Sequence, residues 1–115
     1  MLVTLLKSKI HRATITDCSL DYVGSITLPR RLVDLAGLHE FEKVLVANVA
    51  NGNRFETYVI LVEDGEICLN GAAAHLGKPG DKVILMAWGQ IEEGEAAAFE
   101  PRVVLVDDKN RPKDH

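Results

Sequence analysis

The dipeptide Gly24-Ser25 is the part of this sequence that could carry unusual chemistry. Serine is a weak nucleophile unless a neighbouring group or a strained geometry activates it. Glycine permits backbone angles and close approaches that other residues do not. In a strained Gly-Ser bond, the serine hydroxyl could attack the preceding carbonyl and turn the amide into an ester. β-Elimination and hydrolysis would then leave a pyruvoyl group at the new N-terminus, although the dipeptide by itself favours a simple turn.

Two basic side chains lie close together near the beginning of the sequence. Lys9 and His11 are two residues apart in a segment, residues 2–16, whose composition predicts a long strand. Alternation along a strand places them on one face, where they could hold an anion. Spacing alone equally fits a solvated strand face, and it favours that simpler interpretation.

A second candidate cluster lies on a strand predicted over residues 54–62, which follows the hairpin signal Asn51-Gly52. With a period of two, Arg54 and Tyr58 share one face, and Thr57 lies on the other unless a bulge intervenes. Arg54 and Tyr58 could therefore face one pocket. The alternatives are a surface Arg-Glu pair and a packed aromatic ring.

Asn70 is a plausible N-cap of a short helical turn over residues 71–75. The first backbone N–H groups of such a turn are unpaired and attract anions. No histidine has metal-ligand spacing with another, so the sequence predicts no metal site.

The remaining pattern is that of many short strands and few helices, which predicts a mainly β, barrel-like fold. A short helix is expected over residues 29–37, with Leu32, Leu35 and Ala36 facing inward. Residues 17–21 look like a polar connection, and Trp88 like a packing residue. The further strands are predicted over residues 22–28, 43–50, 66–69, 82–91 and 102–106, and a partly mobile tail from about residue 107.

Composition limits the classes of function. The 115 residues form one domain, residues 1–115, with 47% apolar residues and a net charge of -4. The acidic balance argues against a nucleic-acid partner. No segment is long enough to span a bilayer, and the apolar start lacks the order of a secretory signal, so we expect a cytoplasmic protein. The two cysteines, Cys18 and Cys68, are expected as free thiols.

Motifs along nearly the whole chain resemble those of the aspartate 1-decarboxylases, enzymes with a self-made pyruvoyl cofactor. In order, they are Lys7-Ser8-Lys9-Ile10-His11-Arg12-Ala13, Tyr22-Val23-Gly24-Ser25-Ile26-Thr27, Asn51-Gly52-Asn53-Arg54-Phe55-Glu56-Thr57-Tyr58, Asn70-Gly71-Ala72-Ala73-Ala74-His75, Pro79-Gly80-Asp81 and Pro101-Arg102-Val103-Val104. Each motif is modest, but their shared order in one short chain is specific.

The resemblance implies a six-stranded double-psi β-barrel with small attached helices. It also implies cleavage between Gly24 and Ser25 into a β fragment, residues 1–24, and an α fragment, residues 25–115. Ser25 would become the pyruvoyl group, with no metal and no pyridoxal phosphate. By resemblance Thr57 assists at the Gly24 carbonyl, and Tyr22 belongs to the same self-processing group.

The same resemblance implies the later chemistry. The amine of L-aspartate would form a Schiff base with the pyruvoyl carbonyl, which acts as the electron sink while carbon dioxide leaves, and β-alanine would result. Lys9 and Arg54 would bind carboxylates, with His11 as a further contact, and Tyr58 would return a proton. Asn70 and the backbone amides of the next three residues would complete the substrate cradle; those residues are Gly71, Ala72 and Ala73.

Family members assemble as homotetramers whose sites lie between adjacent subunits, and a maturation helper protein is possible. The product would supply pantothenate and coenzyme A synthesis. Three rival interpretations are a small β-barrel binding or structural module without catalysis, a DNA-binding small barrel, and a pyruvoyl enzyme for histidine or arginine. The acidic balance disfavours the second, and the cations Lys9 and Arg54 disfavour the third, because a cationic substrate needs an acidic pocket.

Overall fold

The computed structural model describes residues 1–113 of the chain. These residues form eight strands, one α-helix and two short 3-10 helices. The elements in chain order are β1 (Leu2–Thr14), β2 (Asp17–Ser19), β3 (Ser25–Pro29), α1 (Arg30–Ala36), β4 (Lys43–Asn48), β5 (Arg54–Val62), β6 (Cys68–Asn70), η1 (Gly71–His75), β7 (Lys82–Glu92), η2 (Glu93–Ala98) and β8 (Arg102–Leu105).

The strands form one mixed sheet in the order β2-β6-β3-β5-β4-β7-β1-β8. β2 stands at one end of this order and β1 next to the other, yet only Ile15 and Thr16 separate them in the chain. The sheet must therefore curl back on itself. Hydrogen bonds from Thr16 N to Ile67 O (2.8 Å) and from Ile15 N to Asp81 O (2.9 Å) hold the junction. The predicted mainly β, barrel-like class with small attached helices is confirmed.

Eight strands are present in residues 1–113, whereas the resemblance implied a six-stranded barrel and the local pattern predicted seven strands. The prediction of a polar connection over residues 17–21 was wrong, because Asp17–Ser19 pairs in parallel with Cys68–Asn70. The predicted strand over residues 22–28 begins only at Ser25, so Tyr22 to Gly24 form a loop before it. Both differences come from pairing with β6, a partner that local sequence does not reveal.

The core is built by alternation along these strands. Inward side chains include Ile10, Ile26, Val46, Val59 and Leu85, all of them almost fully buried. Because every second residue of each strand faces this core, the residues between them face solvent or the surface hollows.

Helix α1 covers one side of the sheet and ends at Gly37, whose φ of +69° is the left-handed conformation that glycine adopts freely. Leu32, Val33 and Ala36 are its buried residues. Leu35 is 47% exposed, so the inward stripe predicted through Leu35 was wrong. The helix has only two turns, and its packing against β1, β3 and β8 decides which residues are buried.

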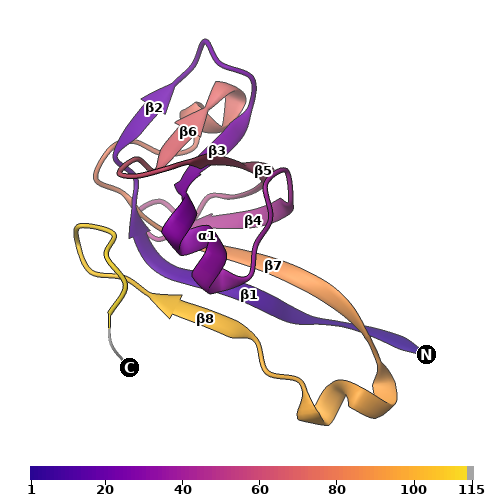
Figure 1. The fold of residues 1–115 in the computed structure, drawn as a ribbon. Coiled ribbons are helices and arrows are strands. Elements are labelled where there is room, and N and C mark those ends of the chain that lie inside the picture. Colours follow the sequence, from indigo (N-terminus) through magenta and orange to yellow (C-terminus); the bar gives the residue numbers. More distant parts are fainter. Residues whose placement is uncertain (114–115) are drawn as a thin grey trace.

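Strands β1 and β7 form a long antiparallel pair that runs past the rest of the sheet to the N-terminus (Figure 1). Leu2 and Trp88 lie on this arm, and each is about half exposed. Trp88 is therefore not the packing residue within the chain that its type suggested. No helix in residues 1–113 has the length and apolar character that crossing a membrane requires.

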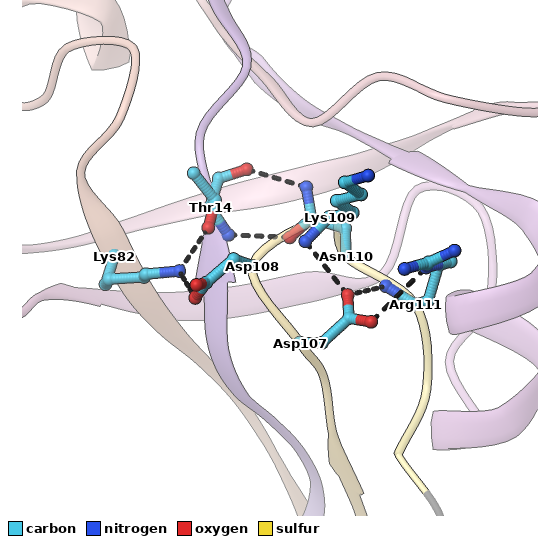
Figure 2. Close-up of polar contacts among 7 residues, drawn as sticks. All are labelled: Thr14, Lys82, Asp107, Asp108, Lys109, Asn110 and Arg111. Atoms are coloured by element: carbon cyan, nitrogen blue, oxygen red, sulfur yellow. Dashed lines mark hydrogen bonds and ion pairs between the residues drawn. The ribbon is translucent and has the colours of Figure 1, made fainter.

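The segment after β8 folds back onto β1 (Figure 2). Asn110 is buried, accepts a hydrogen bond from Thr14 N at 2.7 Å and donates one to Thr14 O at 2.8 Å. Lys82 Nζ donates to Thr14 Oγ1 at 2.7 Å and to Asp108 at 2.8 Å. This turn is thus tied to the sheet, and the last two residues of the expected mobile tail, 114 and 115, lie outside the described part of the chain.

Candidate active site

Ser25 is the first residue of β3, and its side chain is almost fully buried at the edge of a hollow of about 570 Å³. The hollow opens between the loop before β3 and the strands β5 and β6. Besides Ser25, its lining consists of Asp17, Ser19, Tyr22, Val23, Thr27, Tyr58, Ile60, Glu66, Cys68 and Asn70. A serine that is buried within its strand but faces a hollow is well placed to react with its own backbone and then with a small molecule.

The side-chain amide of Asn70 holds the Ser25 hydroxyl. The antiparallel register of β3 and β6 sets Ser25 opposite Asn70. Asn70 Nδ2 donates to Ser25 Oγ and to Thr27 Oγ1, both at 2.9 Å. Asn70 does occupy the N-cap position of η1, but its side chain makes no capping hydrogen bond. The amide nitrogen is instead turned toward Ser25 and Thr27 on the paired strand.

Gly24 lies directly against Gly71, the first residue of η1. Gly71 has a φ of +63°, and a Cβ on it would fall 2.7 Å from both Gly24 N and Tyr22 O. Only a residue without a side chain allows this approach. The backbone that precedes Ser25 therefore packs closely against the junction of β6 and η1.

Thr57 and Tyr58 lie on different sides of β5, as the period of two predicts. Thr57 lines a second hollow of about 350 Å³ together with Gly24, Ala72 and Ala73. Tyr58 borders both hollows, and its ring lies 6.5 Å from that of Phe41. Thr57 is thus near the Gly24 side of the Gly24-Ser25 bond, whereas Tyr58 is near both sides.

Three residues that were predicted to contact the substrate line neither of these hollows in a single chain. Arg54 is exposed at the beginning of β5 and pairs with Ala47 of β4. Lys9 lies on β1 between β7 and β8, opposite Met86 and Val103. His11 lines a separate hollow of about 270 Å³. Neither the Ser25 hollow nor the Thr57 hollow includes any of the three.

The surroundings of His11 are basic. Arg12, Lys82 and Lys113 line the same hollow. Burial lowers the pKa of His11 below its ordinary value, and the nearby charges of Lys9, Arg12 and Lys113 lower it further. Within residues 1–113, the Nδ1 atom of His11 is buried without a hydrogen-bond partner. The lowered pKa therefore favours the neutral form of the His11 ring.

The Ser25 hollow has the opposite electrostatic character. Asp17 and Glu66 line it, and no Lys or Arg from the described residues does. An anionic ligand in this hollow would meet two carboxylates and no compensating cation from the same chain. Nowhere in residues 1–113 do three His, Cys, Asp or Glu side chains gather in a way that could hold a metal ion.

Several lining residues were not found from the sequence. Thr27 could have been, because it lies two residues after Ser25 on one strand and so shares its face. The same argument links Cys68 to Asn70 on β6. Asp17 carried no such signal, since it reaches the hollow only through the parallel pairing of β2 with β6.

Comparison with known proteins identifies a family for this chain. The model of the family described as "Aspartate decarboxylase" matches residues 1–113. Proteins named "Aspartate 1-decarboxylase" are similar over nearly the full length. One from Acetivibrio thermocellus is 56% identical over 96% of this chain and 90% of its own. One from Campylobacter jejuni is 55% identical over 96% and 88%, and one from Leptospira biflexa is 53% identical over 98% of both chains.

These observations define a site in which a buried serine directly follows a glycine, within a small curled β-sheet. The chain belongs to the aspartate decarboxylase family.

The contact between Gly71 and Gly24 gives a first prediction. Gly71→Ala should destabilise the chain by about 1 kcal/mol from its positive φ and by about a further 1–3 kcal/mol from the clash with Tyr22 and Gly24. Urea unfolding measures this. The matched control is Gly52→Ala, which has a φ of +77° and open space around the new Cβ, so it should cost only the first amount. Equal losses in the two variants would show that the close contact is unimportant.

Proposed function

We propose that this chain cleaves itself between Gly24 and Ser25 and then converts L-aspartate to β-alanine and carbon dioxide. The observation that carries the proposal is the position of Ser25, buried in a hollow with Asn70 on its hydroxyl and Gly71 against the preceding glycine. Relatives more than half identical carry the name of this activity. A binding module without catalysis would need neither the buried hydroxyl nor the forced approach of two glycines.

The self-cleavage begins with attack of Ser25 Oγ on the carbonyl carbon of Gly24. The Ser25 hydroxyl lies 3.5 Å from the carbonyl oxygen of Val23, so its proton has only a weak acceptor there. Negative charge develops on the Gly24 oxygen and needs a donor. Thr57 lines the hollow on the Gly24 side and is the donor that we assign. Tyr22 supports the loop, since its backbone contacts Gly71.

The pyruvoyl group made from Ser25 fits this site. It would occupy the hollow where Ser25 now lies, and the N–H groups of Asn70 would hold it. A pyruvoyl carbonyl supplies an electron sink when a bound amino acid loses its carboxylate. The remaining work falls to side chains that bind the two substrate carboxylates and return a proton.

The charge of the hollow implies that its cations come from another copy of the chain. L-Aspartate carries two carboxylates, and Asp17 and Glu66 already make the hollow acidic. The cations Lys9 and Arg54 and the neutral His11 lie elsewhere on the same chain, so we assign all three to the site of an adjacent subunit. The backbone amides of Gly71, Ala72 and Ala73 complete the cradle from the subunit that carries Asn70.

Exposed apolar side chains support an assembly, which we propose to be a homotetramer. Leu20, Tyr22 and Val23 are each more than half exposed on the loop next to the Ser25 hollow, and Leu2 and Trp88 are half exposed on the long arm. Exposed apolar residues gathered in this way mark protein interfaces. An interface over the Ser25 loop would bring a neighbour's side chains to the hollow.

Tyr58 is the proton donor that we assign. It borders the Ser25 hollow and is half-buried, and a tyrosine hydroxyl can give up a proton to a developing carbanion.

We place the enzyme in the cytoplasm and its product, β-alanine, in pantothenate and coenzyme A synthesis. Cleavage of the purified chain with nothing added would show that the possible maturation helper protein is not required.

The intact mass under denaturing conditions tests the self-cleavage. We expect two fragments that meet at Gly24 and Ser25, with the larger one lighter by one ammonia than simple hydrolysis predicts. Ser25→Ala should fold and assemble but remain a single uncleaved chain without activity, because it lacks the attacking oxygen. Normal turnover by this variant, or a wild-type chain that stays whole after prolonged warm incubation, would rule out the pyruvoyl mechanism.

Tyr58→Phe separates the proton donor from self-cleavage. The variant keeps the ring that contacts Phe41, so it should cleave at the wild-type rate. Release of β-alanine should fall by about 100-fold, the usual loss when a general acid is removed. Unchanged release of β-alanine from fully cleaved protein would remove Tyr58 as the donor.

Mixed assemblies test whether neighbouring subunits share the site. Ser25→Ala and Arg54→Gln should each be inactive alone, although Arg54→Gln should still cleave. Co-expressed, they should regain about a quarter of the wild-type activity per site, because random pairing joins an intact Ser25 to an intact Arg54 of the neighbour. The control pairs Arg54→Gln with the double variant Ser25→Ala/Arg54→Gln. Activity that stays absent in the first mixture would place Arg54 and Ser25 of one chain in the same site.

A further inference from the structure

Cys68 is a buried thiol beside the candidate active site with no role in the chemistry described above. It begins β6 and is 6% exposed, and it lines the Ser25 hollow. Its Sγ lies 3.2 Å from Asn70 Oδ1, within hydrogen-bonding range for sulfur. The only other acceptor near it in the described residues is the Leu69 carbonyl oxygen, at 3.8 Å. The thiol therefore contacts the far end of the amide that holds Ser25.

The two ends of the Asn70 amide differ in what they can do. Its nitrogen has two hydrogens to donate, and its oxygen can only accept. The hydroxyls of Ser25 and Thr27 can each donate or accept, so they tolerate either orientation of the amide. If the amide were rotated by half a turn, its N–H groups would face Cys68 sulfur, which is a weak acceptor. Of the three contacts, only the one to Cys68 selects the orientation.

Cys68 stays in the form that can donate. Burial raises the pKa of its thiol above the ordinary value, and nearby Asp17, Cys18 and Glu66 raise it further. The sulfur therefore carries its proton at neutral pH. A thiolate could not donate to Asn70 Oδ1 and would repel it.

We propose that Cys68 is a positioning residue for the self-cleavage, whose S–H group fixes the Asn70 amide with its nitrogen toward Ser25 Oγ. Thr27 secures the second N–H of the same amide. The inference rests on the proposed function and adds to it two residues with a defined task.

The orientation of the amide matters in the second step of cleavage. In the first step, the bond between Ser25 Oγ and the Gly24 carbonyl carbon forms, the amide C–N bond breaks, and the hydroxyl proton moves to the Ser25 nitrogen. In the second, water takes the α-proton of Ser25 and the Cβ–Oγ bond breaks. The electron pair stays on Oγ, which leaves as part of the Gly24 carboxylate. An N–H of Asn70 stabilises the charge that develops on this oxygen, whereas the amide oxygen would repel it.

The test compares cleavage rates by intact mass. Cys68→Ala should cleave about five- to tenfold more slowly, the effect of one misplaced hydrogen bond. Cys68→Ser keeps a donor and should cleave at close to the wild-type rate. In Cys68→Ala the ester should accumulate, so that hydroxylamine releases a larger fragment beginning with an intact serine. The matched control is Cys18→Ala, which removes the thiol of the neighbouring strand β2, one that does not line the hollow.

Thr27 has its own pair of variants. Thr27→Val keeps the shape but leaves one N–H of Asn70 without a partner, so cleavage should slow as in Cys68→Ala. Thr27→Ser keeps the hydroxyl and should cleave at close to the wild-type rate. Equal rates in Cys68→Ala, Cys68→Ser and the wild-type chain, without ester accumulation, would overturn the proposal.

An infrared measurement decides the hydrogen bond whether or not the chain cleaves. In Cys18→Ala the only thiol left is Cys68, so the S–H stretching band belongs to it alone. We expect that band at the lower frequency of a donating thiol, and a rise when Asn70→Leu is added. A band that does not move with Asn70→Leu would overturn the positioning role. A wild-type chain that never cleaves would instead contradict the proposed function.

Discussion

The register of β3 against β6 is the constraint on which the candidate site depends. With Ser25 opposite Asn70, the amide of Asn70 reaches the serine hydroxyl, and the next residue, Gly71, meets Gly24. A slip of one residue would turn these side chains to the opposite face of the sheet. The positive φ of Gly71 and its bare Cα permit the contact that this register demands. The pairing of β3 with β6 therefore positions the residues on both sides of the Gly24-Ser25 bond.

The distribution of charge supports the proposal that the site is shared between subunits. Asp17 and Glu66 are the charged residues that line the hollow at Ser25, while His11 lies in a separate basic hollow and Arg54 is exposed at the start of β5. A dianionic substrate requires cations close to it. The loop before Ser25 is apolar and exposed, which suits contact with another copy. Assembly and substrate binding are thus two aspects of one proposed interface.

Much of the fold could be predicted from local pattern. The strand over residues 54–62 and the helix that ends before Gly37 were found with their bounds almost unchanged. Period-two alternation also predicted that Thr57 stays out of the Ser25 hollow that Tyr58 lines, although Tyr58 borders the Thr57 hollow too. These predictions succeed because they depend on residues a few positions apart, whose relative directions the backbone geometry alone decides.

What the sequence by itself determined is therefore the class of fold, most of the strands and the chemistry available at Gly24-Ser25. Only the tertiary structure decided that Asp17–Ser19 is a strand, that Leu35 faces outward, and that Asn70 turns to Ser25 rather than capping η1. The physical reason is the same in each case. These outcomes depend on pairing or packing between segments far apart in the chain, and such contacts leave no periodic signal in either segment.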